Sequence, residues 1–103
     1  TALIAVTEAQ HHEVELAVAC YVINPDKRSC EFALGVADEW QRQGIGHKLM
    51  NHLMGIARDR GLERMEGEVL SNNFKMLDLM KSLYFQVTPY PEDNSIKQVV
   101  IDL

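Results

Sequence analysis

The sequence contains little cysteine and no long apolar run. Its two cysteines, Cys20 and Cys30, are too few for the disulfide framework that stabilises small secreted domains. Both fall inside apparent strands, where a free buried cysteine is common, so a reducing, cytoplasmic setting is expected. No apolar run approaches the roughly 18 residues that cross a bilayer, and no signal peptide is visible. A membrane partner is therefore not expected.

Positive charge is also scarce. Ten Lys and Arg residues stand against 15 Asp and Glu residues, which gives a net charge of −5. Because no basic patch dominates, the composition argues against a general nucleic-acid binder. With 47% hydrophobic and 24% charged residues, the 103-residue chain is typical of a globular protein with one core. No repeat, low-complexity tract or linker divides residues 1–103, which are expected to form a single domain.

Three extended runs open the chain, at residues 3–6, 14–23 and 29–36. Polar residues separate the first run from the second. The second and third are joined by Asn24-Pro25-Asp26-Lys27, a strong turn signal. Strands joined by short turns predict an antiparallel meander.

A helix is predicted next, from about Gly44 to Arg60. Its apolar residues recur at helical spacing and form one stripe: Ile45, Leu49, Met50, Leu53, Met54, Ile56 and Ala57. Arg58 and Arg60 complement the negative end of the helix, and Gly61 permits a left-handed stop. Residues 63–70 are then predicted to form a strand. Because a helix separates it from the previous strand, the two should be parallel.

The triplet Ser71-Asn72-Asn73 can cap a second helix, which is predicted to end near Tyr84. Residues 85–87 and 95–103 predict two final strands, with Pro89 breaking the chain between them. The expected order is β-β-β-α-β-α-β-β. This order indicates one α/β (α+β) domain with a mixed sheet.

The loop before the first helix carries two glycines, Gly44 and Gly46. They leave the backbone N–H groups at the helix start accessible, and the helix dipole favours an anion there. A pyrophosphate is the natural ligand for such a site. The alternative is a tight strand-to-helix turn that binds nothing.

The six residues Gln41-Arg42-Gln43-Gly44-Ile45-Gly46 resemble the Q/R-x-x-G-x-G/A motif of the GNAT superfamily, the acyl-CoA-dependent N-acetyltransferases. The resemblance implies that they hold the pyrophosphate of coenzyme A. His47, in the first helical turn, is a candidate phosphate contact, with a plain surface histidine as the alternative. The predicted order matches the GNAT fold from its second strand onward. The family's first strand and first two helices are absent, so the chain is expected to be a fragment of a longer protein.

A second stretch, from Glu68 to Phe85, strengthens the resemblance. Asn73 occupies the position of a family asparagine beside the pantetheine arm, and Phe85 that of a family phenylalanine. There are two departures within this stretch. Met80 stands where many members carry a tyrosine that protonates the leaving thiolate, and Tyr84 stands where glycine is usual. The pattern Asn-x-x-Met-Leu resembles the GNAT domain of bacterial protein lysine acetyltransferases.

Glu31 is the best candidate for the base that neutralises the attacking amine. It lies mid-strand between two apolar residues, and burial raises the pKa of a carboxyl group toward the working range. Its position resembles that of the base in protein-acetylating members of the family. The alternative is that Glu31 faces solvent on a half-exposed sheet. Glu68, on the neighbouring parallel strand, is a second carboxylate with the same two interpretations.

The resemblance further implies that the pantetheine pairs with the strand edge at Leu34 and Val36. A backbone N–H near Val36 would then donate to the oxyanion of the tetrahedral intermediate. A rival route through an acyl thioester on Cys20 or Cys30 is disfavoured, because no histidine is placed to activate either thiol.

The expected function is transfer of acetyl from acetyl-CoA to a primary amine, with protein lysine as one candidate acceptor. Acetylation of a small amine is an alternative, and a non-catalytic acyl-CoA-sensing module is another. No metal is expected. Without the family's first helices the chain should expose apolar surface, so a homodimer formed by sheet-edge pairing is also considered.

Overall fold

The computed structural model describes residues 2–9, 12–36 and 44–103, and their element order is the predicted one. The elements are β1 (Ala2–Ala9), β2 (His12–Ile23), β3 (Ser29–Val36), α1 (Ile45–Asp59), β4 (Arg64–Leu70), α2 (Phe74–Ser82), β5 (Gln86–Pro89) and β6 (Ile96–Asp102). Pro89 was expected to break the fifth strand, but it forms the last residue of β5 and pairs with Lys97. β5 is an edge strand, where a residue without an N–H is tolerated.

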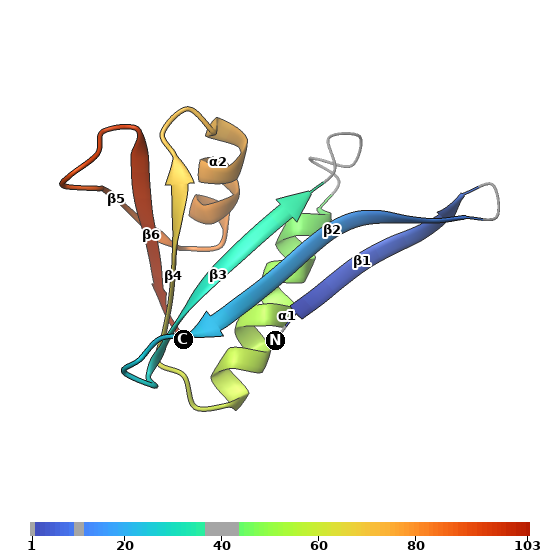
Figure 1. Ribbon diagram of the computed structural model, residues 1–103, viewed down its shortest axis with the longest axis horizontal. Coiled ribbons are helices and arrows are strands. Elements are labelled where there is room, and N and C mark those ends of the chain that lie inside the picture. Colours follow the sequence, from blue (N-terminus) through green and yellow to red (C-terminus); the bar gives the residue numbers. More distant parts are fainter. Residues whose placement is uncertain (1, 10–11, 37–43) are drawn as a thin grey trace.

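The strands form one six-stranded sheet in the order β1-β2-β3-β4-β6-β5. The first three strands pair antiparallel as the predicted meander. The crossover through α1 makes β3 and β4 parallel, again as predicted. β6 pairs antiparallel with both β4 and β5, so the sheet is mixed. Figure 1 shows β3 and β4 rising from a common base and diverging toward their carboxyl ends.

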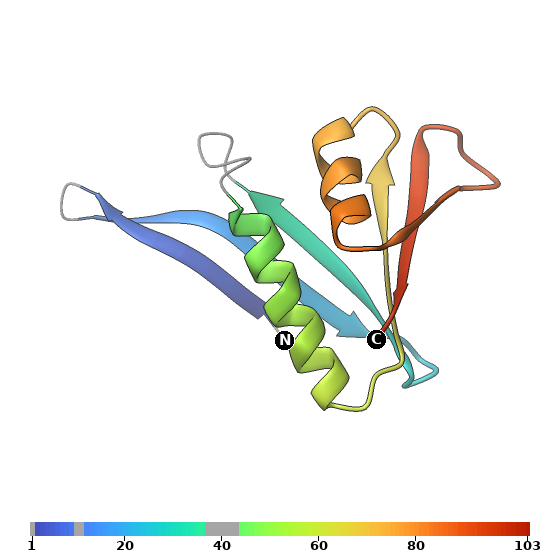
Figure 2. The same cartoon turned by 180° about the vertical axis from the view of Figure 1, so that it is seen from behind.

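Both helices lie on one face of the sheet, α1 across β1, β2 and β3, and α2 beside β5 (Figure 2). The predicted stripe of α1 provides much of the core: Leu49, Met50, Leu53, Met54 and Ala57 are buried. Side chains of β3 point alternately to the two faces of the sheet. Cys30 and Phe32 are buried under the helices, and Glu31 and Ala33 are exposed on the other face. Within the described residues, no helix is long and apolar enough to cross a membrane.

The two helices end in the same hydrogen-bonded motif with different residues. At the end of α1, Leu62 N–H donates to the Ala57 carbonyl, and Gly61 has a left-handed φ of 82°. At the end of α2, Phe85 N–H donates to the Met80 carbonyl, and Tyr84 has a φ of 70°. Both are Schellman motifs, in which N–H groups beyond the helix bond to carbonyl groups of the last turn that have no partner within the helix. The predicted end of α1 at Gly61 is confirmed. Tyr84 occupies the equivalent position after α2, although its Cβ disfavours the left-handed conformation.

Replacing Tyr84 by glycine is therefore expected to raise the free energy of unfolding by about 0.5–1 kcal/mol. The tyrosine side chain is 89% exposed, so its removal loses little packing. Urea unfolding followed by circular dichroism would measure the change. Tyr84→Ala is the matched control, because it removes the ring but keeps a Cβ in the left-handed region. Equal stabilities of the two variants would contradict the explanation.

Candidate functional site

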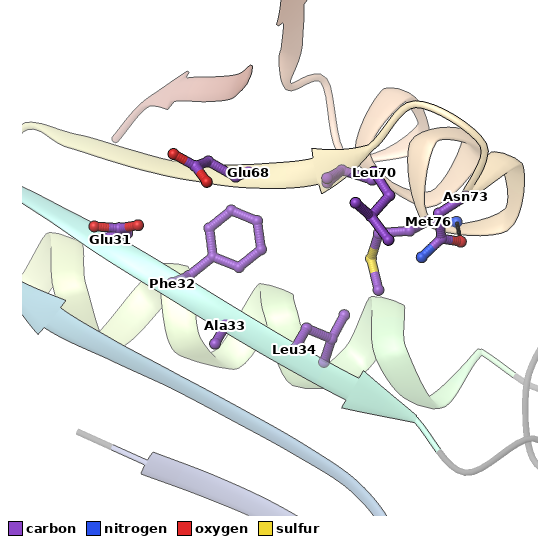
Figure 3. Close-up of a pocket in the computed structure, with 9 residues that line it drawn as sticks. Glu31, Phe32, Ala33, Leu34, Glu68, Leu70, Asn73 and Met76 are labelled. Carbon is purple, nitrogen blue, oxygen red and sulfur yellow. Dashed lines mark hydrogen bonds between the residues drawn. The ribbon is translucent and has the colours of Figure 1, made fainter. Parts of the chain in front are cut away.

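The distinctive feature of the sheet is the separation of β3 from β4. The two strands pair over only three positions in the described chain: Ser29 with Arg64, Cys30 with Met65, and Glu31 with Glu66. Beyond that base a cleft of about 290 Å³ opens between them (Figure 3). Its lining comes from β3, β4 and the start of α2: Glu31, Phe32, Ala33, Leu34, Glu68, Val69, Leu70, Asn73 and Met76. The structure therefore brings together Glu31, Leu34 and Asn73, three of the predicted site residues.

The edge of β3 that faces this cleft presents main-chain groups. The Asn24 N–H donates to the Ser29 carbonyl at 2.9 Å, so Ser29 directs its main chain toward β2. The β2–β3 register then continues without a shift through Val36. Because antiparallel pairs alternate between bonded and non-bonded positions, Leu34 and Val36 direct their main-chain groups away from β2, toward the cleft. An extended ligand could pair with this edge as an added strand.

The two carboxylates of the cleft lie near its closed end. Glu31 on β3 and Glu68 on β4 both line it, and Figure 3 shows their carboxyl groups on the same side of the Phe32 ring. Both side chains are exposed. Of the two interpretations of Glu31, exposure to solvent is the one observed, because strand alternation places the side chain on the face opposite the helices. The described residues leave it open to solvent and to an incoming molecule.

A third carboxylate, Glu66, is bound to its surroundings instead. It accepts a hydrogen bond from Asn24 Nδ2 at 3.0 Å and lies 3.7 Å from Arg64 Nε. The same Asn24 amide donates to Ser29 Oγ, which in turn donates to Asp26. These bonds connect the β2–β3 turn to β4 at the base of the cleft. Glu66 therefore has a structural role where the strands are still paired, whereas Glu31 and Glu68 face the open cleft.

The wide end of the cleft is mainly apolar. Leu34 and Met76 are half-buried there, and Leu70 is 58% exposed. Asn73 is the N-cap of α2, as predicted, and its Oδ1 accepts a hydrogen bond from the Met76 N–H at 3.2 Å. Because the cap uses the oxygen, the Nδ2 donor of Asn73 is oriented by the cap and remains for a ligand.

The start of α1 has the conformation expected of an anion site. Gly44 is the N-cap with a φ of 79°, and no side chain caps the first turn. Gly46 is buried, while Ile45 and His47 are half-buried. Asn51 Nδ2 donates to His47 Nδ1 at 3.0 Å, which holds the ring along the helix. The remaining predicted phosphate contacts, Gln41, Arg42 and Gln43, lie outside the described residues.

Cys30 is unsuited to the rival route through an acyl-cysteine. Its side chain is fully buried, and its thiol lies 3.6 Å from the Arg64 carbonyl, which can accept its proton. Burial, and secondarily the nearby Glu66 carboxylate, raises the pKa of the Cys30 thiol to about 11. Because the thiolate is the nucleophile, such a thiol is unreactive at neutral pH. Cys20 is half-buried and is not among the residues that line the cleft.

Two further findings concern the chemistry that the site can support. Met80, which stands in place of a tyrosine, is fully buried in the core and offers no proton to the cleft. Residues 2–9, 12–36 and 44–103 contain no group of three or more His, Cys, Asp or Glu side chains that could hold a metal ion.

Sequence reasoning missed the contact that closes the cleft. Gly67 on β4 packs against the ring of Phe32, and a Cβ at Gly67 would lie 2.5 Å from Phe32 Cε1. A glycine inside a strand is a signal of close approach by another group, and it could have been used. The ring that fills the space could not have been identified, because that depends on how two distant strands are aligned.

Comparison with known protein sequences finds a matching family model and a relative. A sequence model described as Acetyltransferase (GNAT) family matches residues 3–85. An acetyltransferase of Pseudomonas aeruginosa is 31% identical over 81 residues, which make up 79% of this chain and 44% of that protein. The chain thus spans less than half the length of this relative.

Solved structures share the fold. The GNAT domain of S. lividans PAT has a TM-score of 0.78 and 24% identity, over 86% of this chain and 55% of that one. N-acetyltransferase PseH of Campylobacter jejuni, in complex with acetyl coenzyme A, has a TM-score of 0.68 and 23% identity, over 91% of this chain and 62% of that one. At these identities the likeness establishes architecture, and it confirms the fold predicted from the sequence.

Proposed function

Because this chain belongs to the Acetyltransferase (GNAT) family, we propose that its β3–β4 cleft binds acetyl-CoA and that the protein transfers the acetyl group to a primary amine. The observation that carries the proposal is the separation of two parallel strands after three pairs. It leaves a main-chain edge and two carboxylates in one cleft. The complex of the Campylobacter jejuni enzyme supports acetyl-CoA as the donor within this fold.

Coenzyme A would lie along the carboxyl-terminal half of β3. Its pantetheine amides would pair with the main chain of Leu34 and Val36, and the Asn73 amide would face the arm from α2. Its pyrophosphate would lie at the bare N-terminus of α1, at Gly44 and the residues on either side. The thioester then reaches the closed end of the cleft, where Glu31 and Glu68 line the wall.

In the proposed reaction the neutral amine attacks the thioester carbonyl. A nitrogen–carbon bond forms, the carbon–sulfur bond breaks, and coenzyme A leaves as the thiolate. Glu31 takes the proton that the amine nitrogen loses. A main-chain N–H on the free edge of β3 stabilises the oxyanion. Since Met80 is buried and has no ionisable proton, the thiolate takes its proton from water, and Glu31 returns the proton that it accepted to solvent.

A protein lysine is the acceptor that the cleft supports best. Glu31 and Glu68 are exposed on the sheet face that carries no helix in the described structure. Two carboxylates beside the thioester would attract a cationic side chain before its deprotonation. The Asn-x-x-Met-Leu pattern at residues 73–77, which resembles the bacterial protein lysine acetyltransferases, also supports this acceptor. Acetylation of a small amine remains the enzymatic alternative, and the thiols of Cys20 and Cys30 support a reducing cytoplasmic setting.

A non-catalytic acyl-CoA sensor is the second candidate function, because the buried Met80 replaces the usual proton donor. Calorimetry with acetyl-CoA, followed by an assay of coenzyme A release in the presence of a lysine-containing peptide, separates the candidates. Binding with acetylation of the peptide supports the enzyme. Binding without turnover on any amine supports the sensor, and the absence of binding contradicts both.

Self-association and domain context are proposed with the function. Val22 is 70% exposed and Ile23 is 46% exposed, so the described surface carries apolar side chains outside the cleft that a second copy would cover. We expect concentration-dependent dimers in sedimentation velocity, and a clean monomer at high concentration would count against them. We also propose that residues 1–103 are a fragment of a longer protein, because the match covers 86% of this chain and only 55% of the S. lividans GNAT domain.

A further inference from the structure

The ring of Phe32 forms the closed end of the cleft. Phe32 and Gly67 are the residues that directly follow the last paired positions, Glu31 and Glu66. Where the next backbone pair of β3 and β4 would form, the Phe32 ring instead lies against Gly67. Figure 3 shows the Phe32 ring between the ribbons of β3 and β4.

The position of this ring is fixed on two sides. On one side it lies against Gly67, where a built Cβ would be 2.5 Å, 2.9 Å and 3.0 Å from three ring carbons. On the other side the Phe85 ring has its centroid 5.4 Å away at an interplanar angle of 60°. Phe32 is only 9% exposed although it lines the cleft. A tilted aromatic pair of this kind holds both rings in defined orientations.

The cleft wall therefore changes character at Phe32. Toward the wide end it is formed by Leu34, Leu70 and Met76, and at the closed end by an immobilised ring. The charged part of the same end belongs to Glu31 and Glu68 on the open face of the sheet. An apolar acyl tail would avoid the carboxylates and lie against the ring.

We propose that Phe32, seated on Gly67, limits the length of the acyl chain and makes the site selective for short acyl groups such as acetyl and propionyl. The proposal rests on the proposed binding of acyl-CoA in this cleft. Each further methylene of a longer chain would have to enter space that the ring occupies. Because Gly67 has no side chain, the ring can lie close to β4, which leaves room in the cleft for a short acyl group.

The test measures binding, which needs no known acceptor. Acetyl-, propionyl- and butyryl-CoA are titrated by calorimetry into the natural full-length protein and its Phe32→Leu and Phe32→Ala variants. The unmodified protein should bind butyryl-CoA about tenfold or more weaker than acetyl-CoA, and Phe32→Ala should shift this ratio by about tenfold or more toward butyryl-CoA. Phe32→Leu keeps an apolar side chain and should shift the ratio in the same direction.

Two further variants separate chain-length control from loss of core packing. Leu53→Ala removes a fully buried side chain of α1 that does not line the cleft, so it should leave the ratio unchanged. Gly67→Ala should push the ring into the cleft and weaken acetyl-CoA binding. Adding Phe32→Ala to that variant should restore binding, because the clash is gone.

The outcomes distinguish this inference from the proposed function. If acetyl-CoA binds but both Phe32 variants keep the original preference for chain length, the role of Phe32 is overturned and the proposed binding of acetyl-CoA in the cleft stands. If no acyl-CoA binds the unmodified protein, the proposed function fails and this inference fails with it.

Discussion

Gly44→Asp is expected to weaken acetyl-CoA binding on the order of 100-fold. Gly44 caps α1 with a φ of 79°, and a Cβ added there would meet no atom within 4 Å. A carboxylate at this point would stand where the pyrophosphate is proposed to bind. Two charges a few ångströms apart at the protein surface repel by about 3 kcal/mol, which corresponds to the stated factor. Calorimetry with acetyl-CoA measures the change.

Gly44→Asn is the matched control for that experiment. Asparagine has the size of aspartate, tolerates a positive φ and caps helices equally well, but it carries no charge. The two variants should therefore fold alike and differ mainly in their repulsion of phosphate. We expect Gly44→Asn to keep most of the affinity. Equal affinities for the two variants would place the pyrophosphate somewhere other than the start of α1.

The fold could be predicted because its signals are local. The stripe of α1 repeats at helical spacing, and Gly61 ends that helix with the left-handed φ that a glycine stop requires. The short turn at Asn24 joins two strands directly, so these strands pair antiparallel. A helix between two strands then requires a parallel crossover. Only the ends of the predicted strands and helices were inaccurate. Pro89, for example, forms part of β5, because an edge strand tolerates a proline that a central strand would not.

The site could be predicted only in part. Asn73 was identified because capping depends on a residue and its next three neighbours. The exposure of Glu31 could not be predicted, because either face of β3 can be the buried one until the helices are placed. The separation of β3 from β4 and the contact of Phe32 with Gly67 depend on two strands that are distant in the sequence. These tertiary features shape the cleft.

Glu31→Gln is expected to lower kcat/KM for amine acetylation by roughly 100-fold or more at neutral pH. Glutamine keeps the shape and hydrogen bonding of the side chain but cannot take the proton that the amine must lose. Glu31 lines the closed end of the cleft and is exposed on the face from which an amine can approach. The affinity for acetyl-CoA should be nearly unchanged, because the carboxylate acts on the amine. Calorimetry and steady-state kinetics on the natural full-length protein separate the two quantities.

Glu68→Gln provides the matched control, since Glu68 is also exposed and lines the same cleft from β4. Both substitutions remove one negative charge near the thioester, so a general loss of attraction for a cationic amine would affect both variants and appear mainly in KM. Loss of the base should lower kcat in Glu31→Gln alone. It should also remove an ionisation from the pH profile of kcat/KM that the unmodified protein shows. If Glu31→Gln keeps the original turnover and pH profile, Glu31 is not the base. The proton would then pass to Glu68 or to water, and the Glu68→Gln profile decides between them.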